Sequence, residues 1–160
     1  MKKIFLKPDA PLPYTKTQIP FERSVSDIKS LLKKFGADEV IVYENGEEVK
    51  IAFRKGGIPY IIDFPVIYIE GPKTPARLSM DISGRIVYNR IKTIMLDVEL
   101  GTLSFMQAML RNVALPSPQG LIPLGDVIEA QQDKIIKGGL VEFDPSKIRL
   151  LNAPEEEKYA

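Results

Sequence analysis

Residues 39–64 read EVIVYENGEEVKIAFRKGGIPYIIDF, and this stretch decides the fold. Asn-Gly at 45–46 separates two runs rich in β-branched and aromatic residues, and it is a favoured hairpin turn because both positions accept a positive φ. Apolar and polar residues alternate through the second run, 48–54. A glycine pair at 56–57 then leads to a third run, 58–64. The pattern predicts an antiparallel meander with one buried face and one face in water.

The residues before the meander predict an extended segment and one helix. Four prolines lie within the first 20 residues, and proline breaks helices and removes backbone donors, so we expect a proline-rich arm over 1–14 and a short edge strand at 16–22. Ser24 with Asp27 resembles a capping box and predicts a helix start. An apolar stripe at helical spacing follows it, and Gly36 is expected to end the helix.

The second half of the chain has helical spacing. After a proline-rich loop at 70–79, apolar residues recur every three or four positions over 83–101, 102–113 and 124–137, with a further loop at 116–123. This periodicity predicts three helices. We therefore predict an α+β fold, in which an antiparallel three- to four-stranded meander sheet has one helix before it, in the order β-α-β-β-β, and three helices after it.

The predicted elements suggest a single α+β domain. It covers residues 15–140, with the sheet and first helix in 15–70 and the helical part in 80–140. The proline-rich arm 1–14 precedes it. Residues 141–160 are expected to form a C-terminal extension with a disordered end, because termini without apolar anchors fray. The length of 160 residues suits one such domain.

The composition excludes several kinds of chemistry. The chain has no His and no Cys, which excludes Ser-His-Asp and Cys-His catalysis, the usual zinc sites, iron–sulfur clusters and disulfides. Its 22 Lys and Arg against 21 Asp and Glu give a net charge of +1, so there is no global attraction to nucleic acid or acidic lipid. Neither of the common glycine-rich phosphate-binding motifs occurs.

The sequence gives indirect indications of the protein's location in the cell and of the kind of organism it comes from. No apolar run approaches the roughly 18–20 residues of a membrane helix, and the first residues lack a signal-peptide core. We expect a cytoplasmic protein, inside the host cell if it is viral, with no membrane partner and no small-molecule cofactor. Many Lys, Glu and Ile residues without cysteine are typical of a thermophilic source.

A Mg²⁺-dependent nuclease is the alternative enzymatic interpretation. Glu48 and Lys50 form an E-x-K pattern, and Asp63 supplies an acid on the next strand. Such oxygen ligands can hold Mg²⁺. The E-x-K precedes the acid, however, which reverses the usual order, and a charge pair between strands on the wet face explains the same residues. We therefore expect a protein that is not an enzyme.

Basic residues are concentrated in the middle of the chain. Residues 54–92 hold seven Lys and Arg against three Asp and Glu, a local net charge of +4, and the first predicted helix adds three lysines. Basic residues beside an aromatic side chain can bind phosphates while the ring stacks on a base. DNA or RNA is therefore a candidate partner, with contacts at Lys33, Lys34, Lys50, Arg54, Lys55 and Tyr60; ordinary solvated charge and a core tyrosine are the alternative.

The predicted helices after residue 80 are apolar around much of their circumference. A helix of this kind needs cover on most sides, and methionines can provide an adaptable contact surface. We therefore expect a homo-oligomer, most simply a dimer. The candidate interface residues are Ile91, Met95, Met106 and Met109; the alternative is that they belong to the protein's own core.

Several short motifs in residues 15–130 carry a resemblance. They are Thr15, Ile19-Pro20-Phe21-Glu22, Ser24, Asp27-Ile28, Leu32 and Gly36-Ala37, then a hairpin and a strand ending in Arg54 to Phe64, and Gly101-Thr102-Leu103-Ser104-Phe105. With these motifs the chain resembles small uncharacterised proteins encoded by phages, prophages and archaeal or bacterial mobile elements. In those proteins a similar start precedes a few strands and a long helix that breaks at Gly-x-(Thr/Ser)-aromatic. The resemblance covers roughly residues 15–130 and brings no catalytic residues.

The resemblance implies a viral or mobile-element origin. Together with the missing catalytic groups, it leads to one functional hypothesis. The protein is expected to be a non-enzymatic accessory protein that binds a macromolecule, by self-association and with nucleic acid as a further candidate. The alternative is the Mg²⁺-dependent nuclease of Glu48, Lys50 and Asp63.

Overall fold

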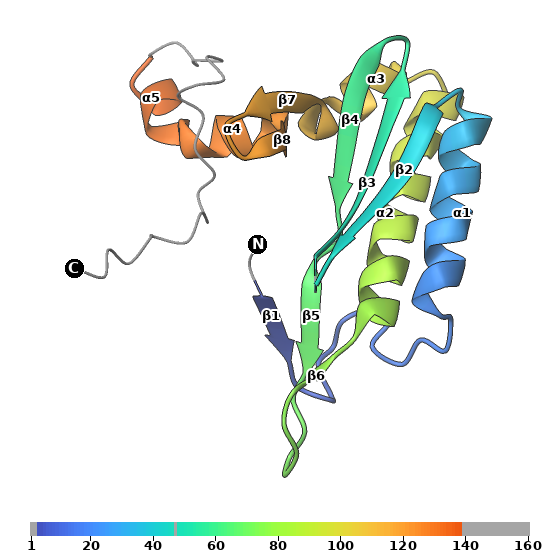
Figure 1. Cartoon of the computed structure of the whole chain (residues 1–160), viewed down its shortest axis with the longest axis vertical. Coiled ribbons are helices and arrows are strands. Elements are labelled where there is room, and N and C mark those ends of the chain that lie inside the picture. The colour runs from blue at the N-terminus through green and yellow to red at the C-terminus, as the bar shows by residue number, and fades with distance from the viewer. Residues whose placement is uncertain (1–2, 47, 139–160) are drawn as a thin grey trace.

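The computed structural model describes residues 3–46 and 48–138. The predicted extension 141–160 lies outside them. The described residues form an α+β fold (Figure 1). Its elements are β1 (Lys3–Leu6), α1 (Phe21–Lys34), β2 (Asp38–Asn45), β3 (Glu48–Lys55), β4 (Ile58–Asp63), β5 (Val66–Ile69), β6 (Arg77–Leu78), α2 (Met80–Glu99), α3 (Phe105–Ala108), the 3-10 helix η1 (Leu110–Asn112), β7 (Ala114–Ser117), β8 (Gly120–Pro123), α4 (Leu124–Ala130) and α5 (Gln132–Ile136).

The predicted meander is confirmed. Strands β2, β3 and β4 form an antiparallel sheet in that order. The turn between β3 and β4 consists of Gly56 and Gly57, both with positive φ, as the glycine pair predicts. The first hairpin ladder closes on the pair Asn45 and Glu48, so its turn lies one residue later than the Asn-Gly prediction.

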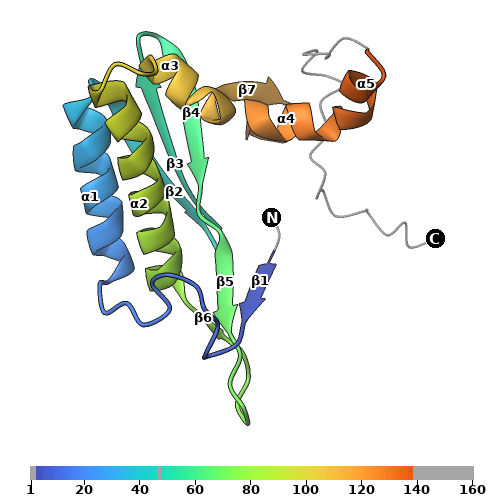
Figure 2. The ribbon, with the colours of Figure 1, turned by 180° about the vertical axis from the view of Figure 1, so that it is seen from behind.

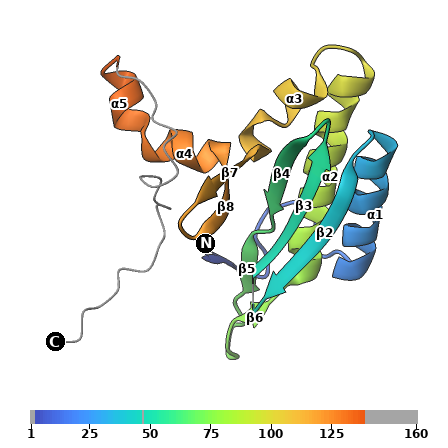
Figure 3. The same cartoon turned by 45° about the horizontal axis from the view of Figure 1, so that its top comes forward.

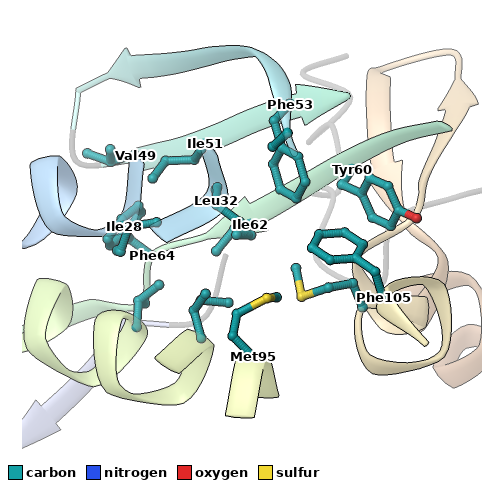
Figure 4. Close-up of a cluster of buried hydrophobic side chains, with 14 of the residues drawn as sticks. Ile28, Leu32, Val49, Ile51, Phe53, Tyr60, Ile62, Phe64, Met95 and Phe105 are labelled. Atoms are coloured by element: carbon teal, nitrogen blue, oxygen red, sulfur yellow. The ribbon is translucent and has the colours of Figure 1, made fainter. Parts of the chain in front are cut away.

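Helices α1 and α2 lie side by side over one face of this sheet (Figure 2). The buried face of β3 and β4 meets the apolar stripes of both helices (Figure 4). The best-buried side chains are Ile28 and Leu32 of α1, Ile51, Tyr60 and Ile62 of the sheet, Phe64 after it, and Val87, Ile91 and Met95 of α2. Burial of each large apolar side chain contributes about 1.5–3 kcal/mol, so this layer is the main source of stability.

The N-terminal segment differs from the prediction. Residues 3–6 of the proline-rich arm form β1, which pairs in parallel with β5 at the edge of a second sheet, β1–β5–β6. No strand forms at 16–22, and α1 begins at Phe21, before the predicted cap at Ser24. The Asp81 carboxylate of α2 accepts a hydrogen bond from the Phe21 backbone N–H at 2.8 Å. A group distant in sequence therefore caps this helix.

The C-terminal half differs more strongly. The predicted helix 102–113 is replaced by the short helix α3 and the 3-10 helix η1. Ser104 and Gln107 form the capping box that starts α3, whereas the Thr102 hydroxyl donates back to the Asp97 carbonyl at 2.9 Å. The predicted loop at 116–123 is part of the hairpin β7–β8. The last predicted helix is divided at Gln131 into α4 and α5.

Residues 114–136, from β7 to α5, form a hairpin–helix segment that projects from the two-layer body (Figure 3). Its hairpin contacts β4, and α4 contacts η1; an isolated bridge between Tyr60 and Val113 lies just before the segment. Its own apolar cluster is small, with Ile122 and Val127 buried and Leu115 packed against them. This segment therefore depends on contacts with the rest of the fold.

Candidate functional site

A polar cleft of about 240 Å³ lies beside the end of β4. We call it the β4 cleft. Its charged residues come from four separate elements: β4, α2, η1 and α4. The polar residues lining it are Asp63, Arg90, Arg111, Asn112 and Asp126.

Two local features fix the η1 wall of the β4 cleft. The Asn112 side-chain N–H donates to the Ile61 carbonyl at 2.9 Å, which ties η1 to β4. Gly125 of α4 leaves space for Arg111, because a Cβ at this glycine would lie 2.5 Å from the Arg111 Cγ. The missing side chain therefore allows the stem of Arg111 to pack against α4.

The carboxylates of the β4 cleft have both positive and negative groups near them. Lys50 Nζ is 3.6 Å from Asp63 Oδ1, and this oxygen is buried without a hydrogen-bond partner in the part of the chain that the structure describes. Burial raises the pKa of Asp126, and the negative charge of Asp63 adds to the increase. Asp63 therefore offers the cleft a buried acceptor that still lacks a donor within the described part of the chain.

The two arginines also lack partners. In residues 3–46 and 48–138, neither Arg90 nor Arg111 forms a hydrogen bond or a close ion pair with a carboxylate. Both residues are exposed to solvent. Packing around Arg90 lowers its pKa, and the positive charge of Arg111 lowers it further. The charge of Asp63, which lines the same cleft, acts in the opposite direction and raises this pKa. The two guanidinium groups thus share the cleft with two carboxylates but lack close partners among the described residues, so their N–H groups are available to an anion.

The residues of the nuclease hypothesis are only partly brought together. Lys50 and Asp63 are register partners on neighbouring strands, as a charge pair between strands requires. Glu48 is paired with Asn45 at the hairpin end and does not line the β4 cleft. Among the described residues, no three Asp or Glu side chains are grouped closely enough to hold a metal ion.

The lysines of the nucleic-acid prediction lie on different parts of the molecule. Lys33 and Lys34 are exposed in the last turn of α1, and Lys34 pairs with Glu99 of α2. Lys55 donates to the Phe35 carbonyl, and its ammonium group lies 5.0 Å from the centre of the Phe105 ring. Lys34 and Lys55 therefore make contacts within the fold, and Lys33 lies at the end of α1.

The remaining nucleic-acid candidates, Lys50, Arg54 and Tyr60, do not form one surface with these lysines. Lys50 and Arg54 are on the sheet face opposite the helices, and Arg54 pairs with Glu39 at 3.3 Å. Tyr60 was expected to stack on a base, but it is only 1% exposed and stacks on Phe53 at 5.1 Å between ring centres. The prediction for Tyr60 is wrong because its side chain points into the core, toward Phe105 (Figure 4).

The predicted oligomer interface is mostly interior. Ile91, Met95 and Met109 are no more than 1% exposed, because α1, α3 and the sheet cover the faces that carry them. Of the predicted set, only Met106 is exposed, at 48%. Three of these four residues therefore lack the exposure that a contact with a second molecule requires.

Two groups of exposed apolar side chains are not among the residues predicted from the sequence. One group, the α2–α3 patch, comprises Leu96, Leu100, Leu103 and Met106. A second group lies on the hairpin–helix segment and comprises Leu121, Ile128, Ile135 and Ile136. In the described residues no helix has the length and apolarity to cross a membrane.

The charged residues of the β4 cleft were not predicted either, apart from Asp63. Arg90, Arg111 and Asp126 belong to three different helices, and no local spacing relates them. Comparisons with known protein families, with curated proteins and with solved structures found no match to this chain.

Proposed function

We propose that this protein is a non-enzymatic binding protein that acts by self-association, in keeping with the predicted accessory role. The observation that carries the proposal is the hairpin–helix segment, residues 114–136. It buries two apolar side chains in its own cluster, Ile122 and Val127. Four large apolar side chains of the same segment stay exposed: Leu121, Ile128, Ile135 and Ile136.

A segment with so small a core gains stability when its exposed face is covered. Burying a large aliphatic side chain contributes about 1.5–3 kcal/mol, and helices as short as α4 and α5 are not stable without packing. The face of the segment is therefore a candidate interface. Contiguous exposed apolar patches are typical of surfaces that bind another protein.

A second copy of the chain is the partner that fits best. The α2–α3 patch is a second exposed apolar surface on the same molecule. In a dimer with two-fold symmetry, each hairpin–helix segment can pack on the partner's α2–α3 patch. The contact then forms twice, and each protomer buries both of its apolar surfaces. The net charge of +1 adds little repulsion between copies.

Nucleic acid has less support as a partner. The basic candidates are divided between the end of α1 and the open sheet face, and several are paired with acids. Binding through phosphates needs positive groups that follow one surface. The structure offers no such continuous set among the predicted residues, so self-association is the function we propose.

Light scattering combined with size exclusion tests the proposal. We expect a dimer at micromolar concentration. Ile128→Lys and Ile136→Lys place a charge on the hairpin–helix segment and should yield a folded monomer, because an unpaired charge is costly in an apolar interface. Ile41→Lys is the matched control: Ile41 is 48% exposed on β2, away from both surfaces, and this variant should remain dimeric.

Two outcomes contradict the proposal. One is a wild-type monomer throughout the micromolar range. The other is a dimer that persists in both segment variants, with circular dichroism showing that their folds are intact. A dimer lost equally in the Ile41→Lys control would place the interface on the open sheet instead and would also overturn the proposal.

A further inference from the structure

The β4 cleft contains two guanidinium groups that lack a close partner in the described part of the chain. Arg90 and Arg111 both line it, and neither has a close carboxylate partner among the described residues. An anion placed between the two would remove the repulsion that each exerts on the other. Phosphate suits this role because its oxygens accept the paired N–H groups of a guanidinium.

The same cleft also contains acceptors. Asp63 Oδ1 is buried and has no hydrogen-bond partner in the described part of the chain, and its nearest cation, Lys50 Nζ, is 3.6 Å away. Asp126 supplies a second carboxylate. Buried acceptors are normally satisfied, and the hydroxyl groups of a ligand are donors of the required kind.

The cleft is also built to hold Arg111 in place. A Cβ at Gly125 would lie 2.5 Å from the Arg111 Cγ, so the stem of the arginine occupies the space above this glycine. Asn112 fixes the adjoining turn to β4 through its hydrogen bond to Ile61. A positioned arginine loses less conformational freedom on binding than one that is free in solvent.

We propose that the β4 cleft binds a small phosphorylated sugar, with Arg90 and Arg111 on the phosphate and Asp63 and Asp126 on sugar hydroxyls. The volume of about 240 Å³ corresponds to several waters at about 30 Å³ each, which leaves room for more than a phosphate. All the residues belong to one chain, so the site does not depend on self-association.

Isothermal titration calorimetry at low salt tests the site with four compounds: ribose 5-phosphate, inorganic phosphate, ribose and adenosine 5′-monophosphate. Ribose 5-phosphate is expected to bind more tightly than inorganic phosphate, and ribose is expected not to bind. Adenosine monophosphate that binds more tightly than ribose 5-phosphate would identify a nucleotide as the source of the sugar phosphate. Weaker binding of this nucleotide would identify a free sugar phosphate.

Variants separate a specific site from general charge. Arg90→Gln and Arg111→Gln should each weaken the affinity for ribose 5-phosphate about tenfold or more. Asp63→Asn should reduce the preference for ribose 5-phosphate over inorganic phosphate. Arg54→Gln is the matched control, because Arg54 is an exposed arginine of the same sheet and does not line the cleft; its affinity should be unchanged.

Gly125→Ala provides a test that keeps every charge. The added methyl group displaces Arg111, so binding should weaken although the net charge is the same. Thermal unfolding of each variant checks that the fold is intact. If a variant of η1 or α4 unfolds, the affinity of Arg90→Gln, at an exposed residue of α2, decides whether the proposal holds. No binding of any phosphate by the wild type overturns the proposal. Equal losses in Arg54→Gln and the cleft variants overturn it as well.

Discussion

Gly84 of α2 lies directly against Ser24 of α1, and a Cβ built on the glycine would be 2.9 Å from the Ser24 Cβ. Ser24 is fully buried. Two small residues at this crossing let the helices approach closely, as ridge-into-groove packing allows. The ring of Phe21 closes the same space, since its edge would also be 2.9 Å from the added Cβ. The crossing therefore has no room for another methyl group.

Gly84→Ala should destabilise the protein. Overpacking typically costs about 1–3 kcal/mol, and the gain in helix propensity from glycine to alanine, about 1 kcal/mol, offsets only part of it. Chemical denaturation measures the free energy of unfolding. Adding Ser24→Gly to the variant removes one of the clashing atoms and should restore part of the loss. A Gly84→Ala variant as stable as the wild type would show that the helices separate without cost.

Ser24→Ala should raise stability. The Ser24 hydroxyl is buried and has no hydrogen-bond partner in the described part of the chain, and an unsatisfied buried hydroxyl costs about 1–3 kcal/mol. Alanine removes it and also favours the helix. We expect a gain of about 1 kcal/mol in denaturant titrations. Ser30→Ala, at an exposed position of α1, is the control and should gain only the propensity term. A loss on Ser24→Ala would mean that the hydroxyl has a stabilising partner.

Ser24 also shows where sequence reasoning about the fold reaches its limit. The meander is predictable because strand alternation and the turn at Gly56 are local signals. A serine followed by an acid is also a local signal, and it predicts a helix start at Ser24. The actual start is set by Asp81, which caps the Phe21 N–H from α2, and by the need for a small residue at the crossing. Both causes are tertiary and leave no trace in local spacing.

The candidate sites follow the same rule. The Lys50–Asp63 pair follows from the register of two predicted neighbouring strands. Arg111 and Asp126 meet only because η1 and α4 fold back beside β4. Met95 illustrates a different limit, since apolar spacing on a helix predicts burial but does not say whether the protein's own sheet or a second molecule provides the cover. Here the sheet and α1 provide it.

Tyr60 should matter for stability through its ring. It stacks on Phe53 at 5.1 Å and meets the edge of Phe105 at 5.6 Å. Removing a large buried ring costs about 3–5 kcal/mol, so Tyr60→Ala should unfold at much lower denaturant concentration, whereas Tyr60→Phe keeps the ring and should lose little. Tyr43→Ala, at a tyrosine that is 54% exposed, is the control. Equal effects at both tyrosines would contradict the burial of Tyr60.

Alkaline titration gives a second measure of Tyr60. Burial raises the pKa of this phenol above its ordinary value of 10.0, so the folded state holds the proton more tightly than the unfolded state. The corresponding stability is present below that value and is lost as the pH rises through the folded pKa. Phenolate absorbance should therefore include a late component that Tyr60→Phe lacks. A titration unchanged by this substitution would contradict the prediction.

The contribution of Asp126 to the free energy of unfolding should change with pH in the direction opposite to that of a salt-bridged acid. Burial, together with the charge of Asp63, raises the pKa of Asp126 above 3.8. The folded state then binds the proton more tightly, and its contribution to stability is complete below that pH and is lost as the pH rises through the folded pKa. Asp126→Asn cannot ionise and avoids this loss. The variant should therefore gain stability over the wild type at neutral pH and gain less near pH 3.8.

Urea denaturation at a series of pH values measures this difference. Asp133→Asn, at an exposed carboxylate of α5 in the same segment, is the control for the change of net charge. If Asp126→Asn instead lost stability at neutral pH and recovered it in acid, the attraction of Arg111 for the carboxylate would outweigh burial. Arg111 would then be neutralised by Asp126 and not by a bound phosphate, so the same titration also bears on the proposed ligand of the β4 cleft.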